Sequence, residues 1–241
     1  VQEISNGSFS QEGSELVTNG DFATDSDWGG VGSNGFSISG GKLILTDVPY
    51  ARTVDQGNVT TLGKTYKVTF EISDYVKGSV RVYLGGSVTS TQTSNGVFTS
   101  YVVASANTAV GIQTLDGGGT TCSIDNVSVR EVGQDWTLNG WEIAENKATC
   151  DASGGATTMT QSAVLTAGKT YKITYTIEDY VSGTVRFRAN FVNGALNGAN
   201  GTYTDYIVSG GTQFGLQGLN GFIGSVTNIS VKEVGQNWDL G

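Results

Sequence analysis

Residues 63–84 read GKTYKVTFEISDYVKGSVRVYL, and residues 168–189 read GKTYKITYTIEDYVSGTVRFRA. Thirteen of these 22 paired positions are identical, at an offset of 105 residues. A second match follows at an offset of 102, with IDNVSVREVGQDW at 124–136 and VTNISVKEVGQNW at 226–238. Solenoid repeats run about 20–50 residues, so a repeat of this length is a whole domain. The chain of 241 residues is therefore predicted to hold two copies of one small domain.

Alternating apolar and polar residues predict strands in both copies. Tyr66, Val68, Phe70 and Ile72 alternate with polar residues, and the second copy repeats this pattern. A period of two is typical of a half-buried strand. The chain has 36 Gly and 1 Pro, and Asn-Gly turns separate its short β-branched runs. We predict an all-β fold of two tandem β-sandwich (jelly-roll) modules of about 105 residues, each with two antiparallel sheets face to face.

The repeats also set the expected domain boundaries. The first module is predicted at 14–133 and the second at 134–235. Residues 1–13 are expected to be the last strand of a preceding module plus a linker, because VQEI at 1–4 resembles VREV at 129–132. Residues 236–241 are expected to start a following module, because NWDLG at 237–241 resembles DWTLNG at 135–140.

Composition excludes several classes of function. The net charge of −9 disfavours nucleic acid and anionic membranes as partners. No apolar stretch approaches the ~20 residues of a membrane span, so no membrane insertion is expected. Histidine is absent, which excludes ordinary zinc sites and Ser-His or Cys-His catalysis. A glycosidase needs two carboxylates about 5–10 Å apart, and no such pair stands out, so we predict no enzyme.

The two cysteines are not numerous enough for a disulfide scaffold. Cys150 aligns with Leu45 at the 105-residue offset, which predicts a small core residue. Cys122 lies just before a repeated strand. A disulfide between Cys122 and Cys150 stays open at this stage.

Several motifs resemble the jelly-roll carbohydrate-binding modules of the family 4/9 type. These motifs are NGDF at 19–22, Trp28, GKTY at 63–66 and the closing segment IDNVSV at 124–129. The resemblance covers most of the first module and is looser in the second, which lacks the opening NGDF. It implies carbohydrate binding without catalysis. The repeated segments also resemble, in their sequence texture, phage and marine-virus structural proteins such as tail fibres and virion decorations, which implies a virion or extracellular location.

The same resemblance implies one structural calcium in module 1 and none in module 2. Asp125 stands where the family places an acidic ligand, and Asp21 and Asp25 could assist, since calcium prefers hard oxygen ligands. Thr227 replaces Asp125 in the second copy. The alternative for Asp125 is a solvated or turn-bonded carboxylate.

The resemblance places the sugar on the concave sheet. Aromatic rings stack on the apolar face of a pyranose, and Arg and Gln bond to neighbouring hydroxyls. The outward residues and loop rings that could do this are Arg81, Tyr83, Gln113 and Tyr50 in the first module, and Arg186, Arg188, Gln217 and Trp141 in the second. The alternative is that Arg81 and Arg186 pair with Glu71, Asp74 or Asp179 on a solvated sheet.

Two functions follow from these observations. The first is a non-catalytic carbohydrate-binding tandem module, within a longer repeat array that attaches a virion or secreted protein to glycans. Its partners would be a glycan or polysaccharide and the neighbouring modules of the same chain. The alternative is a structural spacer or decoration module of a phage virion, with protein–protein contacts. Sugar binding predicts exposed rings beside Arg81 and Gln113, whereas a spacer predicts a polar face of Thr, Ser and Lys.

Overall fold

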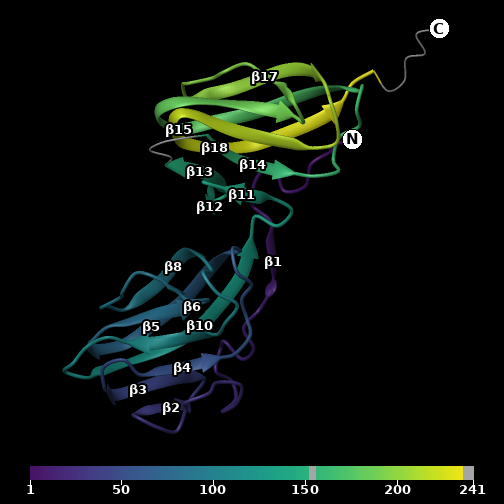
Figure 1. Cartoon of the computed structure of the whole chain (residues 1–241). Coiled ribbons are helices and arrows are strands. Elements are labelled where there is room, and N and C mark those ends of the chain that lie inside the picture. Colours follow the sequence, from purple (N-terminus) through teal and green to yellow (C-terminus); the bar gives the residue numbers. More distant parts are fainter. Residues whose placement is uncertain (152–155, 236–241) are drawn as a thin grey trace. The chain divides into compact units, whose positions relative to one another are not determined.

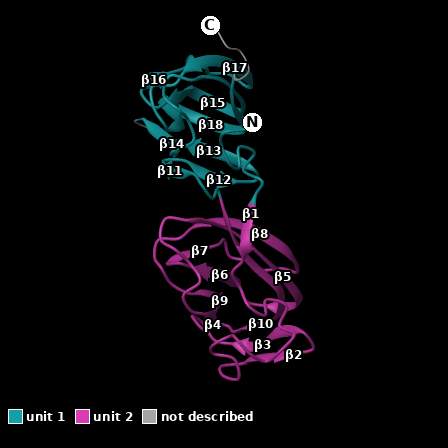
Figure 2. Cartoon of the chain, turned by 90° about the vertical axis from the view of Figure 1, so that its right-hand side faces the viewer, with its two compact units in different colours: residues 1–11, 133–241 teal, residues 12–132 magenta. Residues whose placement is uncertain are grey.

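The computed structural model describes residues 1–151 and 156–235, and every regular element in them is a β-strand. The chain folds into two compact units, as Figure 2 shows. Residues 12–132 form one unit, which we call module 1, and residues 1–11 together with 133–241 form the other, which we call module 2. The all-β fold of two tandem sandwich modules is confirmed.

Module 1 consists of two antiparallel sheets (Figure 1). The first sheet has the order β2-β3-β10-β5-β8, and β1 also pairs with β10. Its strands are β1 (Glu12–Glu15), β2 (Phe36–Ser39), β3 (Lys42–Val48), β5 (Thr65–Lys77), β8 (Gly96–Val103) and β10 (Thr120–Val132). The second sheet has the order β4-β9-β6-β7, from β4 (Thr53–Gln56), β6 (Val80–Leu84), β7 (Ser87–Val88) and β9 (Val110–Thr114).

Module 2 repeats these pairings with longer strands. Its strands are β11 (Thr137–Asn139), β12 (Glu142–Ala144), β13 (Lys147–Asp151), β14 (Thr157–Gln161), β15 (Thr170–Ala189), β16 (Val192–Asn193), β17 (Gly201–Val208) and β18 (Phe214–Glu233). β15 corresponds to β5 and β6 joined, and β18 corresponds to β9 and β10 joined. The first half of β15 pairs with β17 and the end of β18, whereas its second half pairs with β16 and the start of β18. β15 and β18 therefore belong to one eight-stranded sheet that contributes to both layers of the sandwich. By analogy with module 1, we call the layer that contains β17 the first sheet of module 2 and the layer that contains β16 its second sheet.

The core of each module lies between its two faces. The alternating residues of the repeat point inward as predicted, since Tyr66, Phe70, Tyr171 and Tyr175 are all buried. Cys150 is a buried core residue, as expected from its alignment with Leu45. Both cysteines are free, and burial raises the pKa of the Cys122 thiol to about 12, which keeps it protonated and unreactive near neutral pH.

Residues 1–11 do not form the last strand of a preceding module. They pack on module 2, where they take the place that residues 14–24 take in module 1 (Figure 2). The amide of Glu3 donates to the carbonyl of Val231 at 2.8 Å, as the amide of Leu16 donates to that of Val129 at 3.0 Å. The expected boundaries at 1–13 and 134–235 are corrected accordingly. The expectation for 236–241 lies outside the described residues.

The equivalence of the two opening segments extends to their side chains. Gln161 bonds both backbone groups of Ser5, and Gln56 bonds both backbone groups of Thr18. A tryptophan then closes each segment over a phenylalanine. Trp136 lies 5.6 Å from Phe9 between ring centroids and donates to the carbonyl of Asn6, and Trp28 lies 5.2 Å from Phe22 and donates to that of Asn19. Both tryptophans are buried within their own modules, and Trp238 lies outside the described residues.

Module 1 is thus an insertion in module 2. Five residues, 23–27, join Phe22 to Trp28 in module 1, whereas the whole of module 1 lies between Phe9 and Trp136 in module 2. Exposed loop tips are the positions where proteins tolerate inserted domains. The chain therefore crosses from one module to the other twice, between 11 and 12 and between 132 and 133.

We expect Phe9→Ala to destabilise module 2 and leave module 1 unchanged. Phe9 is 2% exposed, and truncating a buried Phe typically costs about 3–5 kcal/mol. Hydrogen exchange followed by mass spectrometry on the whole chain would report each module separately. Phe22→Ala is the matched control, with the opposite pattern. Faster exchange in residues 12–132 of the Phe9 variant would contradict the insertion.

The second residue of each opening segment, Glu15 in module 1 and Gln2 in module 2, differs in charge. Burial alone raises the pKa of Glu15, but hydrogen bonds from Ser128, Val129, Val17 and Leu16 outweigh it and hold the pKa below its usual range. Gln2 takes the same place in module 2 and accepts bonds from Ser230 and Val231. A lowered carboxyl pKa adds stability above the unfolded pKa, and this is lost as pH falls through the folded pKa.

We therefore expect Glu15→Gln to flatten the acid dependence of module 1. Wild-type module 1 should lose stability as pH falls below about 4.5, the unperturbed Glu pKa, because protonation removes the charged acceptor. In the variant this part of the loss should be absent, and module 2, with neutral Gln2, should behave alike in both proteins. Urea unfolding followed by module-resolved exchange at pH 3 to 7 checks this. An equally steep loss in the variant would show that Glu15 is not responsible.

Candidate functional site

The second sheet of module 1 presents a paired Arg and Gln. Arg81 on β6 and Gln113 on β9 are opposite one another in the register of these strands. Their neighbours Val80, Val82 and Ile112 are buried, so the two polar side chains point outward. The Arg81 Nε donates to the Gln113 Oε1 at 2.9 Å. The pairing is a direct consequence of strand register.

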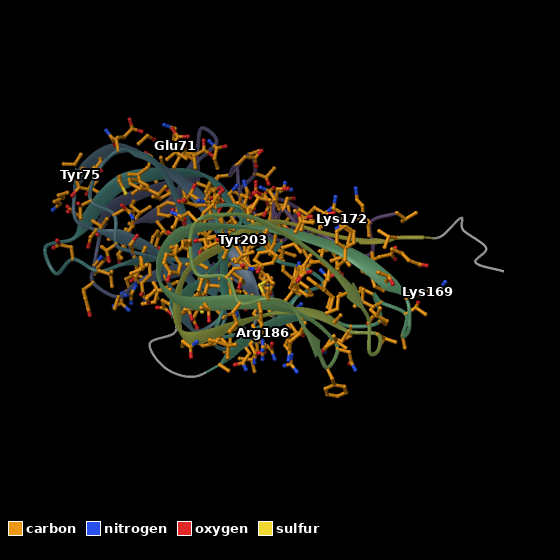
Figure 3. The ribbon with its side chains drawn as sticks, turned by 90° about the horizontal axis from the view of Figure 1, so that it is seen from above. Glu71, Tyr75, Lys169, Lys172, Arg186 and Tyr203 are labelled. Carbon is orange, nitrogen blue, oxygen red and sulfur yellow. The ribbon has the colours of Figure 1, made fainter. Side chains whose placement is uncertain are left out.

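Module 2 has the same pair in the same place. Arg186 on β15 is the register partner of Gln217 on β18, and both its Nε and one terminal nitrogen donate to the Gln217 Oε1, at 3.1 and 3.0 Å. Figure 3 shows Arg186 on the opposite side of module 2 from Lys172, which lies on the first half of β15. The residues predicted to share a face are therefore brought together in both modules. We call this surface the Arg–Gln face.

The expected acidic partners of these arginines are engaged elsewhere. Asp74 pairs with Lys42 at 3.2 Å, and Asp179 pairs with Lys147 at 3.1 Å. Glu71 accepts a bond from the side chain of Asn126 at 3.0 Å. The alternative that Arg81 and Arg186 pair with these carboxylates is wrong. In the described part of the chain, neither arginine forms an ion pair.

A glycine lies beside each Arg–Gln pair. Tyr83 is opposite Gly111 in module 1, and Arg188 is opposite Gly215 in module 2. A Cβ on Gly111 would come within 2.8 Å of the Thr53 side chain, so the strands leave no room for a larger residue there. Tyr83 and Arg188 share the face with Arg81 and Arg186, as predicted, and both are half-buried.

The two loop rings behave differently from the prediction. The prediction that Trp141 stacks on a sugar is wrong, because Trp141 is 3% exposed and its ring centroid lies 5.7 Å from that of Phe222. Its alignment with the buried Phe36 at the 105-residue offset carried this signal in the sequence. Tyr50 is 59% exposed on the loop before β4. No ring contact among the described residues links it to the Arg–Gln face.

Sequence reasoning missed two exposed apolar side chains near the face in module 2. A bridge between Val185 and Asn197 places Leu196 alongside Arg186, and Leu196 is 52% exposed. Phe191 is 82% exposed in the two-residue turn between β15 and β16. Aromatic residues in loops follow no strand or helix periodicity, so the pattern of the sequence does not reveal Phe191. The one signal in the sequence is that module 1 has Gly86 at the matching position.

The structural calcium expected at Asp125, with Asp21 and Asp25 assisting, stays a prediction. One oxygen of Asp125 accepts a bond from the amide of Asn126, and one of Asp21 accepts from the amide of Ala23. Within residues 1–151 and 156–235, no three His, Cys, Asp or Glu side chains gather in a way that could hold a metal. The local bonds of Asp125 and Asp21 match the turn-bonded alternative for these carboxylates. In module 2, Thr227 bonds the carbonyl of Asn146 at 3.0 Å.

Comparison with known proteins yields coarse structural likeness only. No protein-family model matches the sequence, and no curated protein matches it. Among solved structures, the tandem CBM22-1-CBM22-2 domains of Paenibacillus barcinonensis Xyn10C are similar at 10% identity and a TM-score of 0.36, over 93% of this chain and 98% of that one. Allantoicase from Saccharomyces cerevisiae is similar at 7% identity and a TM-score of 0.29, over 79% and 80%. At these TM-scores, function must be argued from this chain's own geometry.

No helix of sufficient length and apolar character to span a bilayer occurs in residues 1–151 or 156–235.

Proposed function

We propose that the chain is a non-catalytic tandem carbohydrate-binding protein whose ligand lies on the Arg–Gln face. The observation that carries the proposal is the repeated register pair, Arg81 with Gln113 and Arg186 with Gln217. Each pair is exposed to solvent in part and has no acidic partner among the described residues.

The chemistry of the pair suits a sugar. The bond from Arg to the Gln Oε1 fixes the guanidinium plane, while the remaining guanidinium N–H groups and the Gln amide nitrogen stay available as donors. Neighbouring hydroxyls of a pyranose accept from such fork-shaped donors. A ring or apolar side chain beside the pair, Tyr83 in module 1 and Leu196 in module 2, offers a surface for the C–H face of the sugar.

Two weak sites on one chain favour a polymeric ligand. Single sugar sites of this size bind modestly, and linking two of them raises the overall affinity only if one ligand reaches both. This supports a glycan or polysaccharide surface as the partner. A setting on a virion or secreted protein, within a longer repeat array, stays a prediction from the sequence texture.

A spacer role is the second candidate, and the first sheet favours it. Hydroxyl pairs line its outer surface in module 2, with Thr174 bonded to Thr204 at 3.0 Å and Thr176 to Thr202 at 2.9 Å. Such a polar, self-satisfied surface needs no ligand. The two roles are compatible, because the hydroxyl pairs and the Arg–Gln face lie on different halves of β15 and hence on different sheets.

We expect the double variant Arg81→Gln/Arg186→Gln to lose glycan binding on a glycan array while keeping its melting temperature. Each half-exposed pair contributes little to stability, whereas losing charged donors weakens binding by about 1.5–3 kcal/mol per bond. Lys67→Gln/Lys172→Gln is the matched control, since it removes the same charge from the first sheet of each module. Retained binding by the arginine variant would move the ligand elsewhere. A blank array with folded wild-type protein would leave the spacer role.

A further inference from the structure

We propose that the Arg–Gln face of module 2 binds an anionic saccharide, one bearing carboxylate or sulfate groups, through Arg186 and Arg188. This inference rests on the proposed function of the same face. It assigns different ligand classes to the two modules, with a neutral sugar on module 1.

The two modules form a comparison at matched positions. Arg, Gln and Gly are the same in both copies at 81/186, 113/217 and 111/215. Two positions of the face differ in charge, and both changes act in the same direction. Arg188 replaces Tyr83, and Thr160 replaces Asp55. Over these positions the face of module 1 is neutral, with one Arg and one Asp, while the face of module 2 carries two positive charges and no negative one.

The two arginines of module 2 are placed to act on one ligand. They are two residues apart on β15, with the buried Phe187 between them, so their side chains leave the same face about 6–7 Å apart. Gln217 orients Arg186. Gly215, the register partner of Arg188, has no side chain of its own, and the Thr160 methyl group packs against it. A carboxylate or sulfate group is small enough to lie between two guanidinium groups at this spacing.

Arg188 lacks a partner for a buried donor. Its Nε is buried and has no hydrogen-bond partner in the described structure. A buried donor left unpaired costs free energy, so little holds this rotamer of Arg188 in place. A rotation that exposes Nε would let a carboxylate or sulfate oxygen accept from Nε and a terminal nitrogen together, in the bidentate geometry that guanidinium favours. The corresponding Tyr83 in module 1 has no such unsatisfied atom.

The positive charge of this face is unusual for the chain. The net charge is −9, and the ion pairs of the described residues engage lysines and Arg130, never Arg186 or Arg188. In module 2, Lys147 forms ion pairs with Glu178 and Asp179, and Lys169 forms one with Glu233. The acidic balance of the whole chain repels any polyanion, and it repels nucleic acid most because the phosphates of nucleic acid are so closely spaced, with one charge per about 1.7 Å of double helix. A saccharide with spaced anionic groups fits a local pair of arginines.

The test compares polymers that differ only in charge. Polygalacturonate and its methyl ester share one backbone and differ in carboxylate charge, and dextran sulfate and dextran share one backbone and differ in sulfate charge. The two pairs therefore separate carboxylate from sulfate. Isothermal titration of the whole chain should show at least about tenfold tighter binding of one or both charged members, weakening with salt. Arg188→Gln should remove most of that preference. Lys172→Gln, which removes one positive charge from the first sheet, should leave it unchanged.

A second variant keeps both arginines. Thr160→Asp restores the acidic residue of module 1 beside Arg188 and should also abolish the preference for the charged polymer, even if Arg188→Gln were to misfold. Circular dichroism and melting temperature verify the fold of each variant.

The outcomes separate this inference from the proposed function. Equal affinity for charged and uncharged polymers, lost in Arg81→Gln/Arg186→Gln, would overturn the anionic ligand and leave a carbohydrate-binding protein. Absence of binding to every polymer, charged or neutral, would overturn both. Binding of a single-stranded oligonucleotide as tight as that of the charged polymers, with the same dependence on Arg188, would overturn the saccharide assignment.

Discussion

The antiparallel pairing of the repeated segment with the closing strand is the constraint on which the rest depends. In module 2 this pairing joins β15 and β18 through both halves of the sandwich, with a register shift between Thr174 and Thr176 and further shifts between Glu178 and Thr184. Its first half builds the core against β17, and its second half sets Arg186 opposite Gln217. A slip of one residue would turn the buried Phe187 outward and the arginines inward, so the hydrophobic core itself enforces the geometry of the Arg–Gln face.

The same closing strand also accounts for the unusual connectivity. Its last residues bond an opening segment, and the chain provides two such segments in succession, at 1–11 and 14–24. Each is recognised by a Gln side chain, Gln161 or Gln56, and by a Trp–Phe contact. The opening segment of module 2 precedes module 1 in the sequence, so the chain passes between the modules twice rather than once. The stability of module 2 therefore depends on residues that are far apart in sequence.

The core and the Arg–Gln face could be predicted from the sequence because the repeat shows each of their positions in two copies. The alternation at Tyr66 and Tyr171 predicts the core, and the matched Arg and Gln predict a shared face. The prediction for residues 1–13 is wrong because VQEI resembles a closing strand. The match that indicates the true role is SNGSF at 5–9 with TNGDF at 18–22, which share three of five residues. The prediction for Trp141 is wrong because the presence of an aromatic residue does not by itself show whether its ring lies in the core or on the surface. The absence of acidic partners for Arg186 depends on which lysines reach Asp179 and Glu178, and sequence spacing does not carry that information.

The central claim is that the Arg–Gln face, and no other surface, contacts a sugar. Backbone and side-chain NMR of the labelled chain, titrated with oligosaccharides cut from the tightest-binding polymer, tests it most directly. The account predicts shift changes at the Arg186 guanidinium, the Gln217 amide and Thr160, with Lys172 and Thr204 on the first sheet unmoved. Changes centred on the first sheet, with Arg186 and Gln217 unaffected, would contradict it.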